Sequence, residues 1–136
     1  MRITQLKVGA LLPTREHCPT NVSLFLYNAA VWNAHRIHYD APYTTQIERH
    51  PGIVIDGPLQ GDWLAQCAVN WVGEFGSLQR FQYSNRRACY LGDTLVSGGQ
   101  VIAVSVATGQ VTVDLWVRNA AGEITSPGQA TLQLHS

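Results

Sequence analysis

The sequence has few charged residues and no excess of either sign. Charged side chains make up 13% of the 136 residues, and nine basic residues balance nine acidic ones. A nucleic-acid-binding domain usually has a net basic face, so this balance argues against a nucleic-acid partner. The charged fraction is about half the quarter that is typical of soluble domains, which predicts that part of the surface is covered by another copy or a partner chain.

Cysteine is also scarce, and the three cysteines, Cys18, Cys67 and Cys89, are widely spaced without a Cys-x-x-Cys pair. The odd number argues against a disulfide framework, and the missing pair argues against a zinc ribbon. We therefore expect a reducing, intracellular compartment and place the protein in the cytoplasm. Cys67 and Cys89 are most simply small buried side chains.

Long apolar runs are missing from the chain. No run approaches the roughly 20 apolar residues of a membrane-spanning helix, and no charged segment followed by an apolar one opens the sequence. We expect neither a targeting segment nor membrane contact. A chain of this length buries about two thirds of its unfolded surface, which supports one core without metals or disulfides. One domain over residues 1–136 is therefore predicted.

The first half of the chain predicts one long buried helix. Residues 1 to about 20 contain prolines and are expected to be irregular, and the apolar residues 22–32 fit a short helix or a strand-to-helix segment. From residue 59 the apolar side chains recur at helical spacing in two adjacent rows: Leu59, Trp63, Cys67 and Trp71, then Leu64, Ala68 and Val72. Such a helix is apolar around most of its circumference and is mostly buried. Pro58 suits its first turn, with Asp56 or Gly57 as a cap and Gly73 or Gly76 at its end.

The second half predicts strands. Apolar and aromatic residues alternate within residues 78–90, 94–106 and 111–118, and residues 130–134 close the chain. Gly98 and Gly99 suggest a bulge or bend. One buried helix followed by long antiparallel strands predicts an α+β fold in which the helix lies across one face of the sheet.

The densest group of reactive side chains lies within residues 32–40, which hold two histidines, an arginine, a tyrosine and an aspartate. His35 and His38 have the spacing of metal ligands, but a third and fourth ligand are missing, so no metal site is expected. The alternative is that these residues cap a helix and make buried hydrogen bonds. Five polar side chains beside an apolar segment weaken that alternative, because each buried polar group needs a partner.

The entry to the long helix, Asp56-Gly57-Pro58-Leu59, is the second candidate feature. Backbone N–H groups at a helix N-terminus, with a glycine that allows close approach, can hold a carbonyl oxygen that gains negative charge. On this motif alone an ordinary helix cap is the simpler interpretation. Together the two features supply an acid–base group and an oxyanion site.

Three segments carry a resemblance to a known family: residues 27–40 (YNAAVWNAHRIHYD), residues 50–60 (HPGIVIDGPLQ) and residues 90–93 (YLGD). The chain resembles the MaoC-like hot dog hydratases over about residues 10–134, and within them the branch of mesaconyl-CoA hydratase and mitochondrial-type 3-hydroxyacyl-thioester dehydratase. The resemblance implies a single hot dog fold, in which a curved antiparallel sheet wraps a long buried helix. It also implies reversible addition of water to the double bond of an enoyl-CoA thioester.

The resemblance also implies roles for single residues. His38 falls on the family's catalytic histidine, and Asn33 falls on the aspartate that usually precedes it by five residues. An asparagine cannot exchange a proton at neutral pH, so the acid–base work falls to His38, while Asn33 would position water or substrate. Asp40 would either assist His38 or cap a loop. The N–H of Gly57 would stabilise the thioester oxygen, with His35 also among the substrate-binding residues.

Two departures from the family pattern affect these roles. Relatives commonly carry histidine where this chain has Asp56, and an ionised carboxylate there would repel the oxyanion unless it points away or holds a proton. Asp56 could also supply the carboxylate that Asn33 lacks. Relatives tend to carry arginine and proline before the Gly-Asp pair, where this chain has Ser84, Arg87 and Ala88. Arg86 and Arg87 could meet CoA phosphates, although a solvated arginine pair is the simpler interpretation.

The resemblance leaves the function with three alternatives. The first is an enoyl-CoA hydratase or 3-hydroxyacyl-CoA dehydratase with His38 as general acid and base, which needs no redox cofactor or metal. The second is a non-catalytic hot dog chain that binds an acyl thioester or completes a hetero-oligomer. The third is an acyl-CoA thioesterase. Because relatives often join two hot dog units in one polypeptide, a homodimer or higher oligomer is expected, or a hetero-oligomer with a second hot dog chain.

Overall fold

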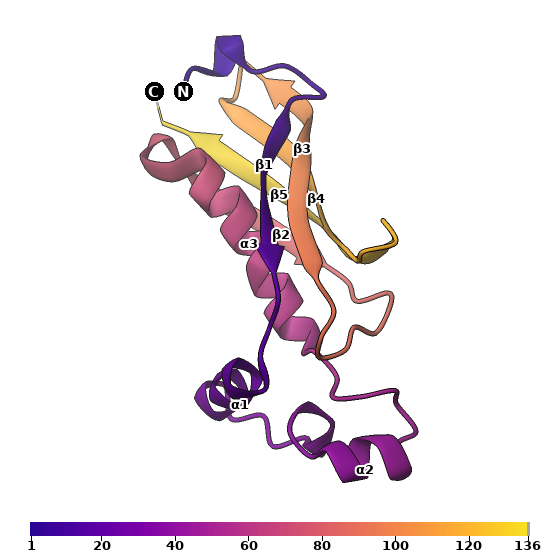
Figure 1. The fold of residues 1–136 in the computed structure, drawn as a ribbon. Helices are drawn as coiled ribbons and strands as arrows, with labels where there is room; N and C mark the ends of the chain where they lie inside the picture. The colour runs from indigo at the N-terminus through magenta and orange to yellow at the C-terminus, as the bar shows by residue number, and fades with distance from the viewer. Residues whose placement is uncertain (136) are drawn as a thin grey trace.

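A long helix crosses one face of a five-stranded antiparallel sheet in the computed structural model, which describes residues 1–135 (Figure 1). The helix is α3 (Gly57–Val72), and the strands lie in the order β1-β3-β4-β5-β2. Their bounds are β1 Leu11–His17, β2 Gly76–Tyr83, β3 Leu95–Ser105, β4 Gln110–Arg118 and β5 Ile124–Leu134. The predicted α+β arrangement is confirmed.

The shorter helices gather beyond the end of the sheet at which α3 begins (Figure 1). They are α1 (Asn21–Ala30) and α2 (Ala41–Gln46), with the 3₁₀ helix η2 (Arg36–His38) between them, while η1 (Ile3–Gln5) and η3 (Gly73–Phe75) lie elsewhere. A reciprocal pair of hydrogen bonds between Thr20 and Ser23 caps the first turn of α1. The apolar segment at residues 22–32 therefore takes the helical alternative, and the reactive group at residues 32–40 follows α1 directly.

The prediction that residues 1–20 are irregular is wrong for residues 11–17. They form the edge strand β1, which pairs with β3 so that Leu12 faces Gly99 and Arg15 faces Ser97. Pro13 and Thr14 of β1 together face a single residue of β3. The bulge therefore lies in β1, opposite the position in β3 where Gly98 and Gly99 predict it. A proline is tolerated there because an edge strand at a bulge needs no N–H at that position.

Two strands differ in length from their predicted bounds. β2 ends at Tyr83 rather than near residue 90, although the backbone N–H groups of Ser84 and Arg86 still donate to the carbonyls of Pro127 and Thr125 in β5. β5 is longer than predicted because it pairs with β4 on one side and β2 on the other. The loop between β2 and β3 is consequently held beside the N-terminal end of α3.

The inner face of α3 forms the centre of the core. Leu64, Ala68 and Val72 are at most 1% exposed and pack against the apolar face of the sheet; burying a large apolar side chain contributes about 1.5–3 kcal/mol. The helix ends at Gly73, whose φ of +54° favours glycine, as predicted. The helix is less covered than predicted, because Val69 is 44% exposed and Cys67 and Trp71 are only half-buried.

Candidate active site

His38 is the buried end of η2 and is held by the segment that leads into α3. Its Nδ1 lies 2.7 Å from the carbonyl oxygen of Val54, and the N–H of Val54 donates to the carbonyl of Ile37. A carbonyl only accepts, so Nδ1 carries the hydrogen, and Nε2 of the neutral ring keeps its lone pair. No hydrogen bond to Nε2 forms among the described residues. The ring is therefore oriented with its basic nitrogen free.

Asp56 is the carboxylate that approaches His38. Its Oδ1 lies 3.4 Å from Nδ1 of the histidine, and the side chain is fully buried. Nδ2 of Asn28 donates to Oδ1 at 3.0 Å, and Nδ2 of Asn33 lies 3.4 Å from Oδ2. Although Asp56 precedes the first turn of α3, its side chain makes no capping bond there. It points toward the histidine, and two amides and an imidazole surround it.

Asp40 does not take part in this group. It caps α2 by accepting from the backbone N–H of Tyr43 at 3.2 Å, and Arg36 donates to its Oδ2 at 2.9 Å. These two partners hold the pKa of Asp40 below its usual value. The guanidinium of Arg36 also lies over the Tyr43 ring, 4.0 Å from its centroid. Of the two interpretations of Asp40, the structure shows the loop cap, and Asp56 is the carboxylate beside His38.

Asn33 and His35 shape the loop that leads to His38. Oδ1 of Asn33 accepts from the N–H of His35 at 3.1 Å, and Nδ1 of His35 accepts from the N–H of Ile37 at 3.2 Å. The rings of His35 and His38 meet edge-on, with centroids 6.0 Å apart, but His35 is exposed. Asn33 thus lies beside Asp56, and His35 lies at the rim.

Gly57 is the first residue of α3, and its N–H has no acceptor among residues 1–135. The amide of Asn85, from the loop after β2, lies against it, and a Cβ at residue 57 would overlap the Asn85 side chain. Oδ1 of Asn85 accepts from the hydroxyl of Ser126, which is fully buried, at 2.9 Å. The free N–H at the start of a long helix, on a residue without a side chain of its own, can hold an oxygen that gains negative charge.

Arg86 and Arg87 lie in the same loop as Asn85 and are exposed. Arg87 forms an ion pair with Glu123 at 3.1 Å, which offsets its charge, while Nε of Arg86 donates to the hydroxyl of Ser84. Arg86 lines a polar hollow of about 400 Å³ between the loop and β5. Their predicted contact with CoA phosphates stays a prediction, and Arg86 is the freer of the two side chains.

Asn28 and Asn85 are site residues that the sequence reasoning missed. Asn28 and Tyr27 lie in α1, and Tyr27 donates from its hydroxyl to Asp62 at 3.4 Å. Burial, with the negative charges of Asp62 and Asp56, raises the pKa of Tyr27 to about 12. The signal for Asn28 was an amide within an otherwise apolar helix; Asn85 gave no signal, because its role depends on contact with Gly57.

An apolar hollow of about 370 Å³ opens beside this group, between α1 and the loop that follows it. The amides of Asn28 and Asn33 belong to its lining, and the remaining lining residues are Phe25, Ala29, Trp32, Ala34 and Tyr39. Trp32 is 94% exposed at a φ of +59°, a left-handed conformation in which bulky residues are rare. A large aromatic side chain therefore stands free at the mouth of the hollow.

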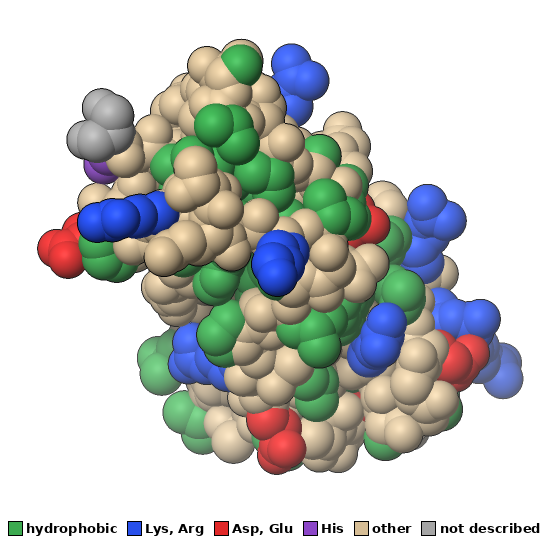
Figure 2. Space-filling model, turned by 90° about the horizontal axis from the view of Figure 1, so that it is seen from above, with side chains coloured by type: hydrophobic (Ala, Val, Ile, Leu, Met, Phe, Trp, Pro, Cys, Tyr) green, Lys and Arg blue, Asp and Glu red, His purple; other side chains and the backbone are tan. Residues whose placement is uncertain are grey.

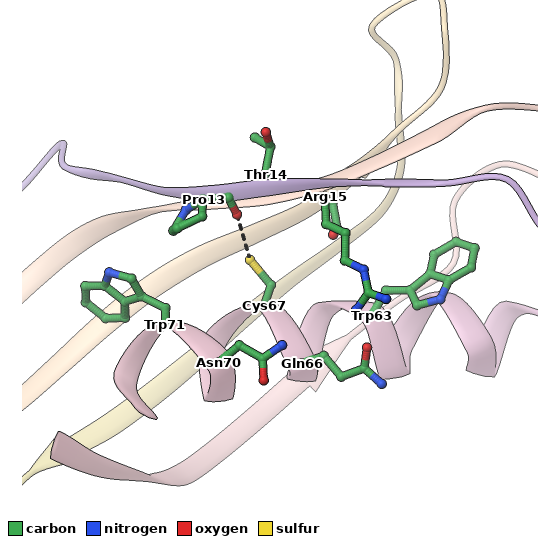
Figure 3. A pocket seen from close by; sticks show the side chains of 9 residues that line it. Pro13, Thr14, Arg15, Trp63, Gln66, Cys67, Asn70 and Trp71 are labelled. Atoms are coloured by element: carbon green, nitrogen blue, oxygen red, sulfur yellow. Dashed lines mark hydrogen bonds between the residues drawn. The ribbon is translucent and has the colours of Figure 1, made fainter. Parts of the chain in front are cut away.

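A second hollow, of about 270 Å³, lies between β1 and α3 (Figure 3). Trp63, Cys67 and Trp71 project from α3 toward it, below the bulge at Pro13, whose carbonyl lies 3.8 Å from the Cys67 sulfur. Trp63 is buried as predicted, whereas Trp71 is half-buried. None of the predicted site residues lines this hollow.

Three observations concern the nucleic-acid, membrane and metal partners that the sequence analysis considered. Lysine and arginine side chains stand at several separate places on the face in Figure 2, with acidic side chains among them. Within residues 1–135, no helix is long and apolar enough to cross a membrane. The same residues contain no group of three or more His, Cys, Asp or Glu side chains placed to hold a metal ion.

Known proteins resemble this chain in sequence and in fold. Mesaconyl-C(4)-CoA hydratase of Chloroflexus aurantiacus is 46% identical over 55 residues, which are 40% of this chain and 20% of that protein, so the match spans one fifth of the relative's length. The (R)-hydratase of A. caviae, involved in PHA biosynthesis, has the same fold with a TM-score of 0.87, 14% identity and coverage of 96% of this chain and 98% of that chain.

The ChsH1–ChsH2 complex of Mycobacterium tuberculosis also contains this fold, with a TM-score of 0.83, 19% identity and coverage of 95% and 98%. The predicted hot dog fold is confirmed by these two structures. The sequence model of the hydroxyacyl-thioester dehydratase type 2 family matches residues 9–91, which include His38, Asp56, Gly57 and the loop with Asn85. The chain therefore belongs to the hydroxyacyl-thioester dehydratase type 2 family.

Proposed function

We propose that the chain adds water to the double bond of an enoyl-CoA thioester and removes it from the 3-hydroxyacyl product. The observation that carries the proposal is the joint placement of a free basic nitrogen and a free backbone N–H. Nε2 of His38 supplies the first, and Gly57 supplies the second. Val54 binds the histidine ring and begins the four-residue segment that ends at Gly57. A base for water and a donor for the thioester oxygen are what this reaction needs.

In hydration, Nε2 of His38 takes a proton from water as the water oxygen bonds to the β-carbon. The electrons of the double bond move toward the thioester oxygen, which the N–H of Gly57 stabilises. The proton held by His38 is then returned at the α-carbon, so that one water is added in total. Asp56 stabilises the positive ring between these steps, because a buried carboxylate lowers the cost of a nearby imidazolium. No metal or redox cofactor takes part in these steps.

The test is hydration of crotonyl-CoA by the purified chain and by its His38→Ala variant, followed by loss of absorbance of the conjugated double bond. We expect turnover in the parent chain and a loss of about 10²–10⁴-fold in the variant, the range of general acid–base catalysis. A mesaconyl-type thioester is assayed beside crotonyl-CoA. Unchanged turnover in the variant, with its thermal unfolding intact, removes His38 from this role.

The same assay separates the two other functions. A thioesterase releases free CoA, which a thiol reagent detects, whereas a hydratase leaves the thioester intact. A non-catalytic binding chain shows neither reaction but binds acyl-CoA. Activity that appears only when a second hot dog chain is added would make this chain one part of a hetero-oligomeric hydratase.

We also propose that a second hot dog unit covers the free edge of β2, in a homodimer or with a partner chain. β2 pairs with β5 on one side, and its other edge makes no ladder within residues 1–135. Tyr83 on this strand is 38% exposed, and Val69 on the neighbouring α3 is 44% exposed. Exposed strand edges with apolar neighbours favour pairing with another chain. A stable monomer in a solution mass measurement would contradict this proposal.

The cytoplasm is proposed as the compartment. All three cysteines are free, and Cys89 is buried whereas Cys18 is exposed. Free thiols persist in reducing compartments. Fractionation of cells that express a tagged chain, with the tag at the C-terminus, tests the assignment.

A further inference from the structure

One buried polar atom beside His38 and Asp56 is left without a partner. Asn28 is 4% exposed, and its Oδ1 is the single buried side-chain nitrogen or oxygen among residues 1–135 that lacks a hydrogen bond. Leaving a buried acceptor unsatisfied costs about 1–3 kcal/mol. An unpaired acceptor in a site of this kind indicates a donor that arrives with a ligand.

The orientation of this amide is fixed by its own nitrogen. Nδ2 of Asn28 donates to the carbonyl of Leu24 at 2.8 Å and to Oδ1 of Asp56 at 3.0 Å. Exchanging the two ends of the amide would turn its oxygen toward two acceptors, so Oδ1 must face the other way. The amide of Asn33 differs, since its Oδ1 already accepts from the N–H of His35. Of the two amides that line the apolar hollow, Asn28 holds the unused oxygen.

We propose that Oδ1 of Asn28 accepts the hydrogen of the 3-hydroxyl group of the acyl chain, and of the same oxygen when it enters as water. The proposal rests on the function proposed above. Asp56 brings Asn28 and His38 together, at 3.0 Å and 3.4 Å from its Oδ1. Oδ1 of Asn28 is buried and has no partner among the described residues, so it is available to a donor that the substrate or the attacking water brings. The reacting oxygen then lies between Asn28, which takes one hydrogen bond, and Nε2 of His38.

This arrangement assigns both hydrogens of the water. In dehydration Nε2 of His38 takes the proton from the α-carbon, and the electrons of that C–H bond form the double bond. The hydroxyl, whose own hydrogen is donated to Asn28, receives this proton from His38, and the C–O bond breaks with its electrons on the departing water. Asn28 therefore recognises the 3-hydroxyl group, and the role that the sequence suggested for Asn33 in holding water passes to Asn28.

The test compares two ligands that differ only in the hydroxyl, 3-hydroxybutyryl-CoA and butyryl-CoA. Their affinities are measured by calorimetry in the His38→Ala chain, in which turnover of 3-hydroxybutyryl-CoA is slowed about 10²–10⁴-fold. We expect the hydroxyl to improve affinity about tenfold, the worth of one buried hydrogen bond, and the preference to vanish when Asn28→Leu is added. Asn33→Leu is the matched control: it removes the other amide that faces Asp56 but leaves Oδ1 of Asn28 in place, so the preference stays.

The outcomes separate this inference from the proposed function. A hydroxyl preference that survives Asn28→Leu, or is missing from the starting chain, overturns the role of Asn28 while hydration of crotonyl-CoA by the parent chain stands. A parent chain that hydrates no thioester overturns both. If Asn28→Leu does not fold, as judged by its thermal unfolding, Asn28→Ala takes its place. With His38 intact, either variant should lower kcat about tenfold and change the KM of crotonyl-CoA little, because the hydrogen bond forms to the attacking oxygen.

Discussion

Asp56 approaches Nδ1 of His38 to 3.4 Å, while the hydrogen of that nitrogen is directed to the carbonyl of Val54 at 2.7 Å. The carboxylate therefore acts on the ring by charge, and the carbonyl sets its tautomer. Two amides also hold the carboxylate, one at each of its oxygens. Within one segment, Val54 therefore fixes the orientation of the His38 ring and Asp56 supplies a negative charge beside it.

Replacing Asp56 tests the electrostatic part of this arrangement. Asp56→Asn keeps the size of the side chain but removes its charge, so the imidazolium of His38 loses its counter-charge in a buried site. We expect hydration of crotonyl-CoA to slow by about 10–10²-fold, less than on loss of the histidine itself. Asp40→Asn, which removes an exposed pair with Arg36 but keeps a capping side chain, should change the rate by less than about twofold. Equal losses in both variants would contradict the assignment of Asp56.

The glycine that opens α3 predicts a compensating pair of substitutions. In Gly57→Ala the new Cβ meets the amide of Asn85, whose Cγ would lie 2.8 Å away. We expect a loss of about 1–3 kcal/mol in the free energy of unfolding and about tenfold in hydration rate, because the oxyanion N–H is shielded. Asn85→Ala in the same chain should restore the stability but not the rate. A double variant as unstable as Gly57→Ala would show that the strain lies elsewhere.

His17 predicts that stability falls on mild acidification. Its ring stacks on Trp63 at 4.0 Å and bonds to the Ser97 hydroxyl, and burial, then the charge of Arg15, lowers the pKa of His17 to about 4. Since an unfolded histidine has a pKa of about 6.5, the unfolded chain binds the extra proton between these values. The free energy of unfolding therefore decreases as the pH falls from about 6.5 to about 4. The decrease is roughly 2 kcal/mol after allowance for solvent screening. Urea unfolding at pH 7 and pH 5 measures the difference in the free energy of unfolding, which should be much smaller in His17→Gln. A difference that the variant retains would come from other titratable groups.

The cysteines should differ widely in reactivity. Cys18 is exposed, Cys89 is 1% exposed, and burial raises the pKa of both Cys67 and Cys89. Because the thiolate is the reactive form, a thiol reagent at pH 7.5 should modify one group quickly and the other two more than about tenfold more slowly. Cys18→Ser should abolish the fast phase. A fast phase that remains in this variant would place a reactive thiol in the hollow beside β1.

The long helix could be predicted from the sequence, whereas β1 could not. Two rows of apolar residues and Gly73 mark α3 because its burial repeats at every turn. In β1 only Leu12 and His17 are buried, since the bulge at Pro13 and Thr14 breaks the alternation on which strand prediction depends. An edge strand of this kind is fixed by its pairing with β3.

The candidate site shows the same division. His38, Asn33 and Gly57 are found by their resemblance to a family motif, which is local in the sequence. The choice between Asp40 and Asp56 depends on which carboxylate meets His38 in the folded chain, and the contact of Asn85 with Gly57 joins two loops. Neither contact leaves a periodic pattern or a characteristic residue spacing in the sequence. Asn28 alone could have been noticed, as an amide in an apolar helix.

The backbone from Val54 to Gly57 joins the carbonyl that orients the histidine to the N–H that is proposed to bind the thioester oxygen. Consecutive residues span at most about 3.3–3.6 Å each. The covalent chain therefore sets an upper limit on the distance between these two groups, and a larger displacement of either one must carry the other with it.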